Sequence, residues 1–270
     1  MTTTDPAPAH PLDPSHTCEA RRRGAFGAAF ALALLTAACG GGGDGGTDDD
    51  VTGPTIPTEP AAIVEASSVA MGDVQSVEFD LTRSGDPVFI DSFESIALSR
   101  AKGQFTVPRS AQAVLEVEVD GSLTTELGAI ALDEEIWLSN PVTGDFETLP
   151  PGYDIDPSLF FDPENGWKPL MANLTDVTFV GIEDIDGNDR YHISGTAPAE
   201  QVAIITARLV RDQDVDIDFW IHPVTGLVSR AEFSTVPPGD DTDTSSIDWA
   251  LQLFDYGAEF DISPPEGVTG

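Results

Sequence analysis

From residue 77 onward, the chain repeatedly alternates apolar and polar side chains with a period of two. Residues 77–82 read VEFDLT and residues 115–120 read LEVEVD. Because successive side chains of a strand point to opposite faces, this period predicts strands with one buried face and one solvated face. The number of such stretches predicts about nine to eleven antiparallel strands. The chain is therefore expected to form a β-rich domain.

Two stretches depart from this period and are predicted as helices. Residues 59–71 follow Thr58, which can cap the first turn, and they carry Pro60 where its missing N–H is harmless. Residues 198–209 begin with Pro198 and place apolar side chains at intervals of three and four. Two or three helices are therefore expected beside the strands.

Two further segments are punctuated by turn residues. Residues 150–174 contain several prolines among aromatic and aliphatic side chains, which predicts short segments that dock through those side chains. Residues 186–189 read DGND, a strong hairpin signal. Residues 184–189 also suggest a calcium loop, but Gly187 falls too early for an EF-hand, so the hairpin is favoured.

The N-terminal segment has the features of a secretory leader. The basic residues 21–23 precede an apolar run, 26–39, that is short for a bilayer span and fits a signal peptide. Residues 35–39, LTAAC, resemble a bacterial lipobox, although Thr36 stands where Leu or Val is more frequent. The resemblance implies cleavage before Cys39 and acylation of its thiol. An uncleaved anchor or an ordinary signal peptide is the alternative.

This resemblance implies an extracytoplasmic protein that is anchored to the cell membrane by lipid. The only other cysteine, Cys18, lies in the leader, so the mature chain is expected to contain no disulfide. The expected organisation is a signal peptide at 1–38, a lipidated flexible tether at 39–60, a folded domain at 61–264 and a tail at 265–270.

The charge of the chain narrows the classes of partner. Its formal net charge is −35, and Lys102 and Lys168 are the only lysines in the sequence. A surface this acidic repels the phosphate backbone, so nucleic acid is not an expected partner. Adsorption to anionic lipid through surface charge is disfavoured for the same reason. Contact with lipid must therefore use an apolar site.

No motif in the chain predicts catalysis, a metal or a cofactor. HExxH, GxSxG, CxxC and P-loop spacings are absent from the sequence. The two histidines after the leader, His192 and His222, each stand alone in a predicted strand and are expected on its solvated face. An extracellular hydrolase remains an alternative without a nameable nucleophile and base. The chain is not expected to be an enzyme.

The order of segments along the chain resembles the LppX/LprAFG family of bacterial lipoproteins, which are related in shape to the LolA and LolB carriers. The segments that carry this resemblance are 61–85, 115–138, 160–187, 191–209, 219–233 and the final strand. It implies an α+β fold in which a strongly curved antiparallel half-barrel sheet is closed over its concave face by helices. Alternation alone favours a closed sandwich instead.

The same resemblance implies a large apolar cavity that binds acylated lipids or glycolipids and carries them outward from the cytoplasmic membrane. An exporter is a further partner to consider. The alternative is a structural or signalling envelope lipoprotein whose sheet binds a protein partner. Apolar residues of the alternating rows are expected to line the cavity: Val77, Phe79, Leu81, Leu115, Val117, Val119, Ile136, Leu138, Val215, Ile217 and Phe219.

Overall fold

The strands form a single antiparallel sheet in a computed structural model that describes residues 59–133, 135–149, 162, 164–206, 208–236 and 246–265. Twelve strands are present among these residues, in the order β7-β6-β5-β4-β3-β1-β12-β11-β10-β9-β8, with β2 paired to β3. The sheet is open, because β7 and β8 each pair on one side within the described part. The strands are β1 (Ser76–Ser84), β2 (Val88–Phe89), β3 (Ile96–Thr106), β4 (Ser110–Val119), β5 (Leu123–Leu132), β6 (Glu135–Ser139), β7 (Phe146–Thr148), β8 (Thr175–Ile185), β9 (Asn188–Ala197), β10 (Val215–Ile221), β11 (Val228–Thr235) and β12 (Ile247–Phe254).

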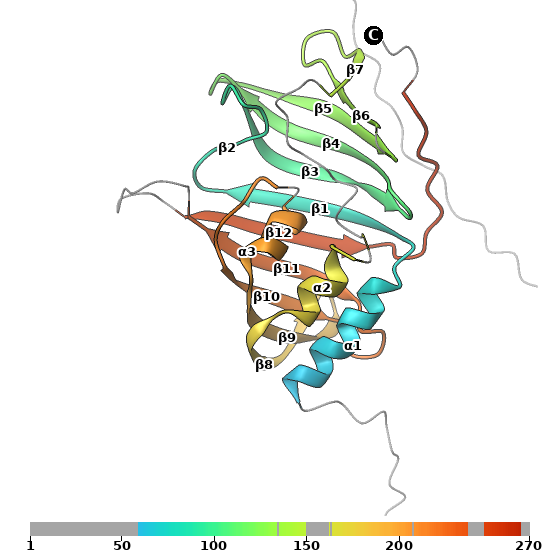
Figure 1. Ribbon diagram of the computed structural model, residues 1–270, viewed down its shortest axis with the longest axis vertical. Helices are drawn as coiled ribbons and strands as arrows, with labels where there is room; N and C mark the ends of the chain where they lie inside the picture. Colours follow the sequence, from blue (N-terminus) through green and yellow to red (C-terminus); the bar gives the residue numbers. More distant parts are fainter. Residues whose placement is uncertain are drawn as a thin grey trace, which may run out of the picture. The chain divides into compact units, whose positions relative to one another are not determined.

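The first and last strands of the chain lie side by side at the centre of this sheet (Figure 1). Strands β2 to β7 continue on one side of β1, and strands β11 to β8 continue on the other side of β12. The predicted antiparallel sheet is confirmed, with twelve strands in the described part where about nine to eleven were expected. The short strands β2 and β7 have only two and three residues. The β1–β12 pair therefore joins two halves of the sheet.

Within the part of the chain that the structure describes, three helices lie in front of strands β8 to β12 (Figure 1). They are α1 (Pro60–Gly72), α2 (Trp167–Ala172) and α3 (Ala199–Ile205). Ser68 of α1 donates its hydroxyl hydrogen to the carbonyl of Lys168 in α2 at 2.9 Å. The predicted N-terminal helix is confirmed, with Glu59 rather than a hydroxyl residue at its N-cap and Pro60 in its first turn. Thr58 lies outside the described residues.

The predicted helix at 198–209 is wrong beyond Ile205. The hydroxyl of Thr206 donates to the carbonyl four residues earlier at 2.8 Å and accepts the N–H of Val210 at 3.1 Å. Arg208 adopts a left-handed conformation with φ of 67°, which an α-helix cannot contain. The Thr206 hydroxyl thus replaces a backbone carbonyl as the acceptor for Val210. The helix ends there, although the helical spacing of apolar residues continues to Leu209.

The structure also describes the predicted hairpin and part of the proline-rich stretch 150–174. Asp186 and Gly187 have φ of 54° and 80° and connect β8 to β9, so the predicted hairpin is confirmed. Helix α2 is one of the short segments expected within 150–174. Residues 150–161 of that stretch lie outside the described residues.

Apolar side chains from the sheet and the helices form one buried cluster. Trp167 of α2 is buried, and its ring meets the ring of Phe219 of β10 edge-on at a centroid distance of 6.3 Å. Helix α2 therefore packs on the inward side of β10. No helix in the described ranges is both long and apolar enough to span a bilayer.

Candidate functional site

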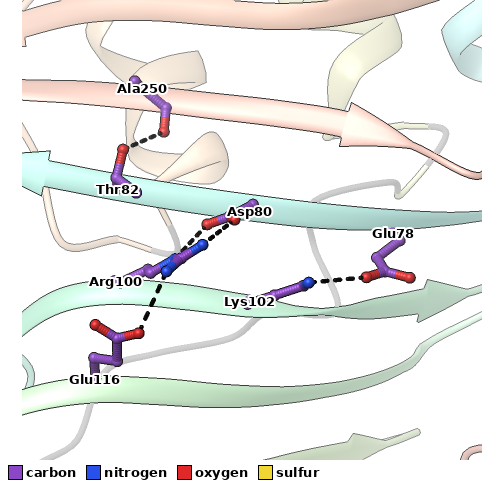
Figure 2. A network of polar contacts seen from close by, with 7 residues as sticks. All are labelled: Glu78, Asp80, Thr82, Arg100, Lys102, Glu116 and Ala250. Carbon is purple, nitrogen blue, oxygen red and sulfur yellow. Dashed lines mark hydrogen bonds and ion pairs between the residues drawn. The ribbon is translucent and has the colours of Figure 1, made fainter. Parts of the chain in front are cut away.

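The outward face of the sheet centre carries a charged network (Figure 2). Arg100 of β3 donates from Nε to Oδ1 of Asp80 on β1 at 2.8 Å, and its Nη1 lies 3.5 Å from Oε1 of Glu116 on β4. Lys102 Nζ lies 3.6 Å from Oε1 of Glu78. The hydrogen bond from Arg100 holds the pKa of Asp80 below its ordinary value. Because successive side chains of a strand point to opposite faces, the residues between these charged ones face the apolar side of the sheet.

The opposite side of these strands carries a partly open apolar cavity of about 80 Å³. Polar side chains at its edge have partners elsewhere, since Gln112 donates to Oε1 of Gln104 at 2.7 Å and Thr206 donates to the carbonyl of Val202 at 2.8 Å. The cavity therefore suits nonpolar contents. Its lining residues are Phe79, Leu81, Ile90, Leu98, Ala101, Ala111, Gln112, Ala113, Leu115, Ala129, Ile130, Ala131, Ile136, Leu138, Leu149, Thr206 and Leu209.

Small side chains explain why this part of the interior is not filled. Ala113 of β4 lies directly opposite Ala129 of β5, and Ala111 lies opposite Ala131. Ala101 of β3 also lines the cavity. Each of these positions faces the apolar side, where most sheets carry branched or aromatic residues. Because these positions carry only methyl groups, the residues packed opposite them do not fill the space.

The size of the cavity has an energetic consequence. At about 24 cal/mol per Å³, an empty apolar cavity of about 80 Å³ costs about 2 kcal/mol of folding free energy. Pockets that bury drug-sized ligands enclose about 300–1,000 Å³. The cavity is therefore a substantial gap for a protein interior, and it is smaller than a pocket that encloses a whole ligand.

The structure divides the predicted cavity residues into two groups. Phe79, Leu81, Leu115, Ile136 and Leu138 line the cavity. The others lie in the buried cluster or against it, and Val119 is half-buried there. The fully or almost fully buried members of this second group are Val77, Val117, Val215, Ile217 and Phe219. Cys39, the predicted lipid anchor, lies outside the described residues.

Sequence reasoning missed the alanines and the contribution of the segment after α3. Ala111 and Ala113 recur with a period of two on β4, and Ala129 and Ala131 recur with the same period on β5, so a pattern of small residues on adjacent strands was the available signal. Leu209 reaches the cavity because the chain leaves the helix at Thr206, which the apolar spacing did not reveal.

A wider groove of about 880 Å³ lies on the outward face, and acidic side chains line much of it, including Asp216, Asp218, Glu232 and Asp248. It is open to solvent and has no comparable apolar wall. No group of His, Cys, Asp and Glu within the described ranges could hold a metal ion. The apolar cavity is therefore the stronger candidate for a binding site.

The two histidines have structural contacts. His192 places Nδ1 2.7 Å from Oε1 of Glu183 and Nε2 2.9 Å from Oδ1 of Asp218, and its ring stacks on Trp220 at 4.5 Å. It lies on the outward face as expected, but these neighbours cover most of its side chain. His222 accepts backbone N–H groups within its own turn through Nδ1.

An open antiparallel sheet with few helices is a fold that solved structures share. The crystal structure of LprF from Mycobacterium bovis matches with a TM-score of 0.59 at 19% identity, covering 78% of this chain and 99% of LprF. Mycobacterium tuberculosis lipoprotein LppX matches with a TM-score of 0.53 at 18% identity, covering 76% and 98%. These likenesses show the fold.

Sequence comparison identifies the family. The chain matches the LppX_LprAFG lipoprotein family over residues 59–262 and belongs to it, which confirms the predicted resemblance. The lipoarabinomannan carrier protein LprG of Mycobacteroides abscessus is 23% identical over 201 residues, covering 74% of this chain and 84% of that protein. Lipoprotein LprA of Mycobacterium tuberculosis is 21% identical over 232 residues, covering 84% and 92%.

Proposed function

We propose that this protein is a membrane-tethered carrier that binds acylated lipids or glycolipids in the apolar cavity and carries them outward from the cytoplasmic membrane. The observation that carries the proposal is a cavity with an apolar lining in a member of a lipoprotein family. A relative named as a lipoarabinomannan carrier supports the same substrate class. The proposal includes a half-barrel sheet whose concave side the helices help to close.

The physical basis is the cost of exposing an acyl chain to water. A sixteen-carbon chain in water costs about 12 kcal/mol at about 0.8 kcal/mol per CH₂. A bilayer and an apolar cavity both remove that cost, so transfer between them is nearly balanced. Such a protein lowers the barrier to lipid passage without ATP, and the direction of transport must come from a donor, an acceptor or an exporter.

The proposal requires the cavity to widen when lipid enters. Its present volume, about 80 Å³, is below the size of pockets that enclose whole ligands. Leu209 and Thr206 line it from the irregular segment after α3 rather than from a hydrogen-bonded strand. Displacing such a segment costs fewer backbone hydrogen bonds than separating strands, so widening is expected on this side.

Membrane attachment is proposed through Cys39. A diacylglycerol thioether provides two acyl chains, and two chains are sufficient for stable anchoring. The predicted location is the extracytoplasmic side of the cell membrane. Labelling cells with radioactive palmitate tests this, because label should enter the wild-type protein and be lost in Cys39→Ser. Equal labelling of both proteins would exclude Cys39 as the acylated residue.

Lipid binding is tested with the full chain carrying Cys39→Ser, purified and stripped of lipid. We expect saturable uptake of a fluorescent fatty acid and displacement of the probe by unlabelled diacylglycerol. Mass spectrometry of the protein before stripping should detect co-purified acylated lipid. Absence of both uptake and co-purified lipid would contradict the carrier proposal and favour the alternative, a sheet that binds a protein partner.

A further inference from the structure

One row of residues across the sheet has bulky ends and a small centre. Phe79 of β1 lies opposite Gly103 of β3, which lies opposite Ala113 of β4. Ala113 in turn lies opposite Ala129 of β5, and Ala129 lies opposite Leu138 of β6. Gly103, Ala113 and Ala129, here called the small-residue row, therefore occupy three consecutive strands without a side-chain atom beyond Cβ.

The two rows beside it differ in side-chain size. On one side, Leu81, Ala101, Leu115 and Leu127 lie opposite one another on the same strands. Same-face rows are about 7 Å apart along a strand, so this leucine-rich row forms a wall beside the small one. On the other side, Ala111 and Ala131 lie opposite each other between Phe105 and Ile136. The small-residue row and these two alanines together are thus the base of a trough, which is bounded by the leucine-rich row on one side.

Exposure within the cavity agrees with this geometry. Ala113 and Ala129 are half-buried although they face the apolar side, whereas Leu127 in the neighbouring row is fully buried. Phe79 and Leu138, the two ends of the row, both line the cavity and are buried. Strands are about 4.8 Å apart, so the distance from β1 to β6 is about 19 Å.

We propose that an acyl tail lies across strands β3 to β5 on the small-residue row, and that side-chain volume at Ala113 and Ala129 sets the longest tail accepted. Phe79 and Leu138 limit the tail at its two ends. The inference rests on the proposed lipid-binding function and adds to it the orientation of the tail and the residues that select its length. The ligand class is an acyl chain without polar substituents, because the trough offers no polar partner.

The alanines are the appropriate positions to change. A Cβ added at Gly103 would overlap the carbonyl oxygen of Gln112 on β4, so a substitution there would disturb the sheet. At Ala113 or Ala129, an isobutyl group in place of a methyl extends into the cavity. Displacing about two tail methylenes should weaken binding about tenfold.

The experiment uses the full chain with Cys39→Ser and a fluorescent fatty acid displaced by saturated fatty acids of increasing length. We expect Ala113→Leu and Ala129→Leu to bind long chains about tenfold more weakly and short chains nearly as well as the parent. Ala250→Leu is the matched control, because Ala250 faces outward on β12 and lies opposite Thr82 and Glu232. Its length profile should equal that of the parent.

A second variant tests the same row in the opposite direction. Leu138→Ala removes the side chain that limits the tail at one end of the row, so the acyl-chain length that binds most tightly should increase. A parent that takes up acyl probes, with unchanged length profiles in Ala113→Leu, Ala129→Leu and Leu138→Ala, would overturn the inference and leave lipid binding intact. A parent that takes up no probe would instead overturn the proposed function.

Discussion

The two halves of the sheet share the same alternation of apolar and polar residues, but their inward faces are filled differently. In the β8–β12 half, Ile193, Ile217 and Phe219 are fully buried, and Trp167 of α2 packs against Phe219. In the β3–β6 half, Ala113 and Ala129 are half-buried beside an unfilled cavity. Side-chain volume and helix cover, rather than the alternation itself, therefore decide where an antiparallel sheet keeps internal space.

The largest expected effect tests the packed half. Phe219→Ala removes a fully buried ring that contacts Trp167, and we expect a loss of about 3–5 kcal/mol in unfolding free energy. Leu115→Ala, in the wall of the cavity, should cost only about 1–2 kcal/mol, because Leu115 is half-buried and already borders empty space. Urea denaturation of both variants measures the difference. Equal losses would show that the two halves are packed alike.

The next effect concerns the loop that leads into the cavity half. Asp91 is buried, and its carboxylate accepts hydrogen bonds from the N–H of Phe93 at 3.2 Å, of Ser95 at 3.0 Å and of Ile96 at 2.8 Å. Its neighbour Ile90 lines the cavity. Asp91→Ala leaves these donors without a partner, so we expect a loss of about 2–3 kcal/mol in unfolding free energy.

The matched change in the packed half is Asp184→Ala. Asp184 accepts the N–H of Gly187 at 3.0 Å in an exposed hairpin turn, where water can replace the carboxylate. We expect a loss below about 1 kcal/mol. Thermal or urea unfolding compares the two variants, and a larger loss from Asp184→Ala than from Asp91→Ala would contradict the assigned burial of these turns.

Much of the sheet could be read from the sequence, because alternation and turn residues act locally. Residues 77–82 and 115–119 lie in strands, and the hairpin at Asp186 and Gly187 forms as expected. The end of α3 could not be read in this way. A hydroxyl at Thr206 competes for backbone hydrogen bonds, and apolar spacing does not register that competition.

The cavity itself was harder to predict, because space depends on which side chains meet across strands. Gly103, Ala113 and Ala129 are far apart in the chain, and only the register places them in one row. Sequence reasoning chose large apolar residues as lining, whereas the space arises beside small ones. Phe219 shows the converse, since its burial depends on Trp167 of α2, whose position over β10 no local pattern specifies.

A smaller effect is expected at the junction of the two halves. Asp80 lies on β1, and its hydrogen bond from Arg100 lowers its pKa. A carboxyl whose folded pKa is lowered stabilises the fold above its unfolded pKa and loses that contribution as pH falls through the folded pKa. Asp80→Asn should therefore cost about 1 kcal/mol near neutral pH, because Arg100 is partly exposed, and the difference from wild type should shrink below about pH 4.

Unfolding free energies measured across the acidic range check this expectation. Glu126→Gln is the control, since Glu126 is exposed on the outward face of β5. A difference between wild type and Asp80→Asn that stays constant from neutral to strongly acidic pH would show that the Asp80–Arg100 hydrogen bond does not contribute through charge.

The smallest effect is expected on the outward face of the packed half, where Glu183 joins edge strand β8 to its neighbours. Glu183 accepts the indole N–H of Trp220 at 2.7 Å and contacts Nδ1 of His192 at 2.7 Å, and these hydrogen bonds lower its pKa. An ionised carboxylate can only accept, so His192 forms hydrogen bonds to both Glu183 and Asp218 only when both ring nitrogens carry protons.

Glu183→Gln retains a carbonyl oxygen for Trp220 and removes the charge beside His192. It should therefore destabilise the protein less than Asp80→Asn, and its difference from wild type should vanish as pH falls through the lowered pKa of Glu183. Amide hydrogen exchange is the sensitive measurement, because faster exchange should be confined to β8 and β9 and should leave the β3–β6 half unchanged. Faster exchange around the cavity as well would mean that the two halves open together. The difference in their packing would then not correspond to a difference in their local opening free energies.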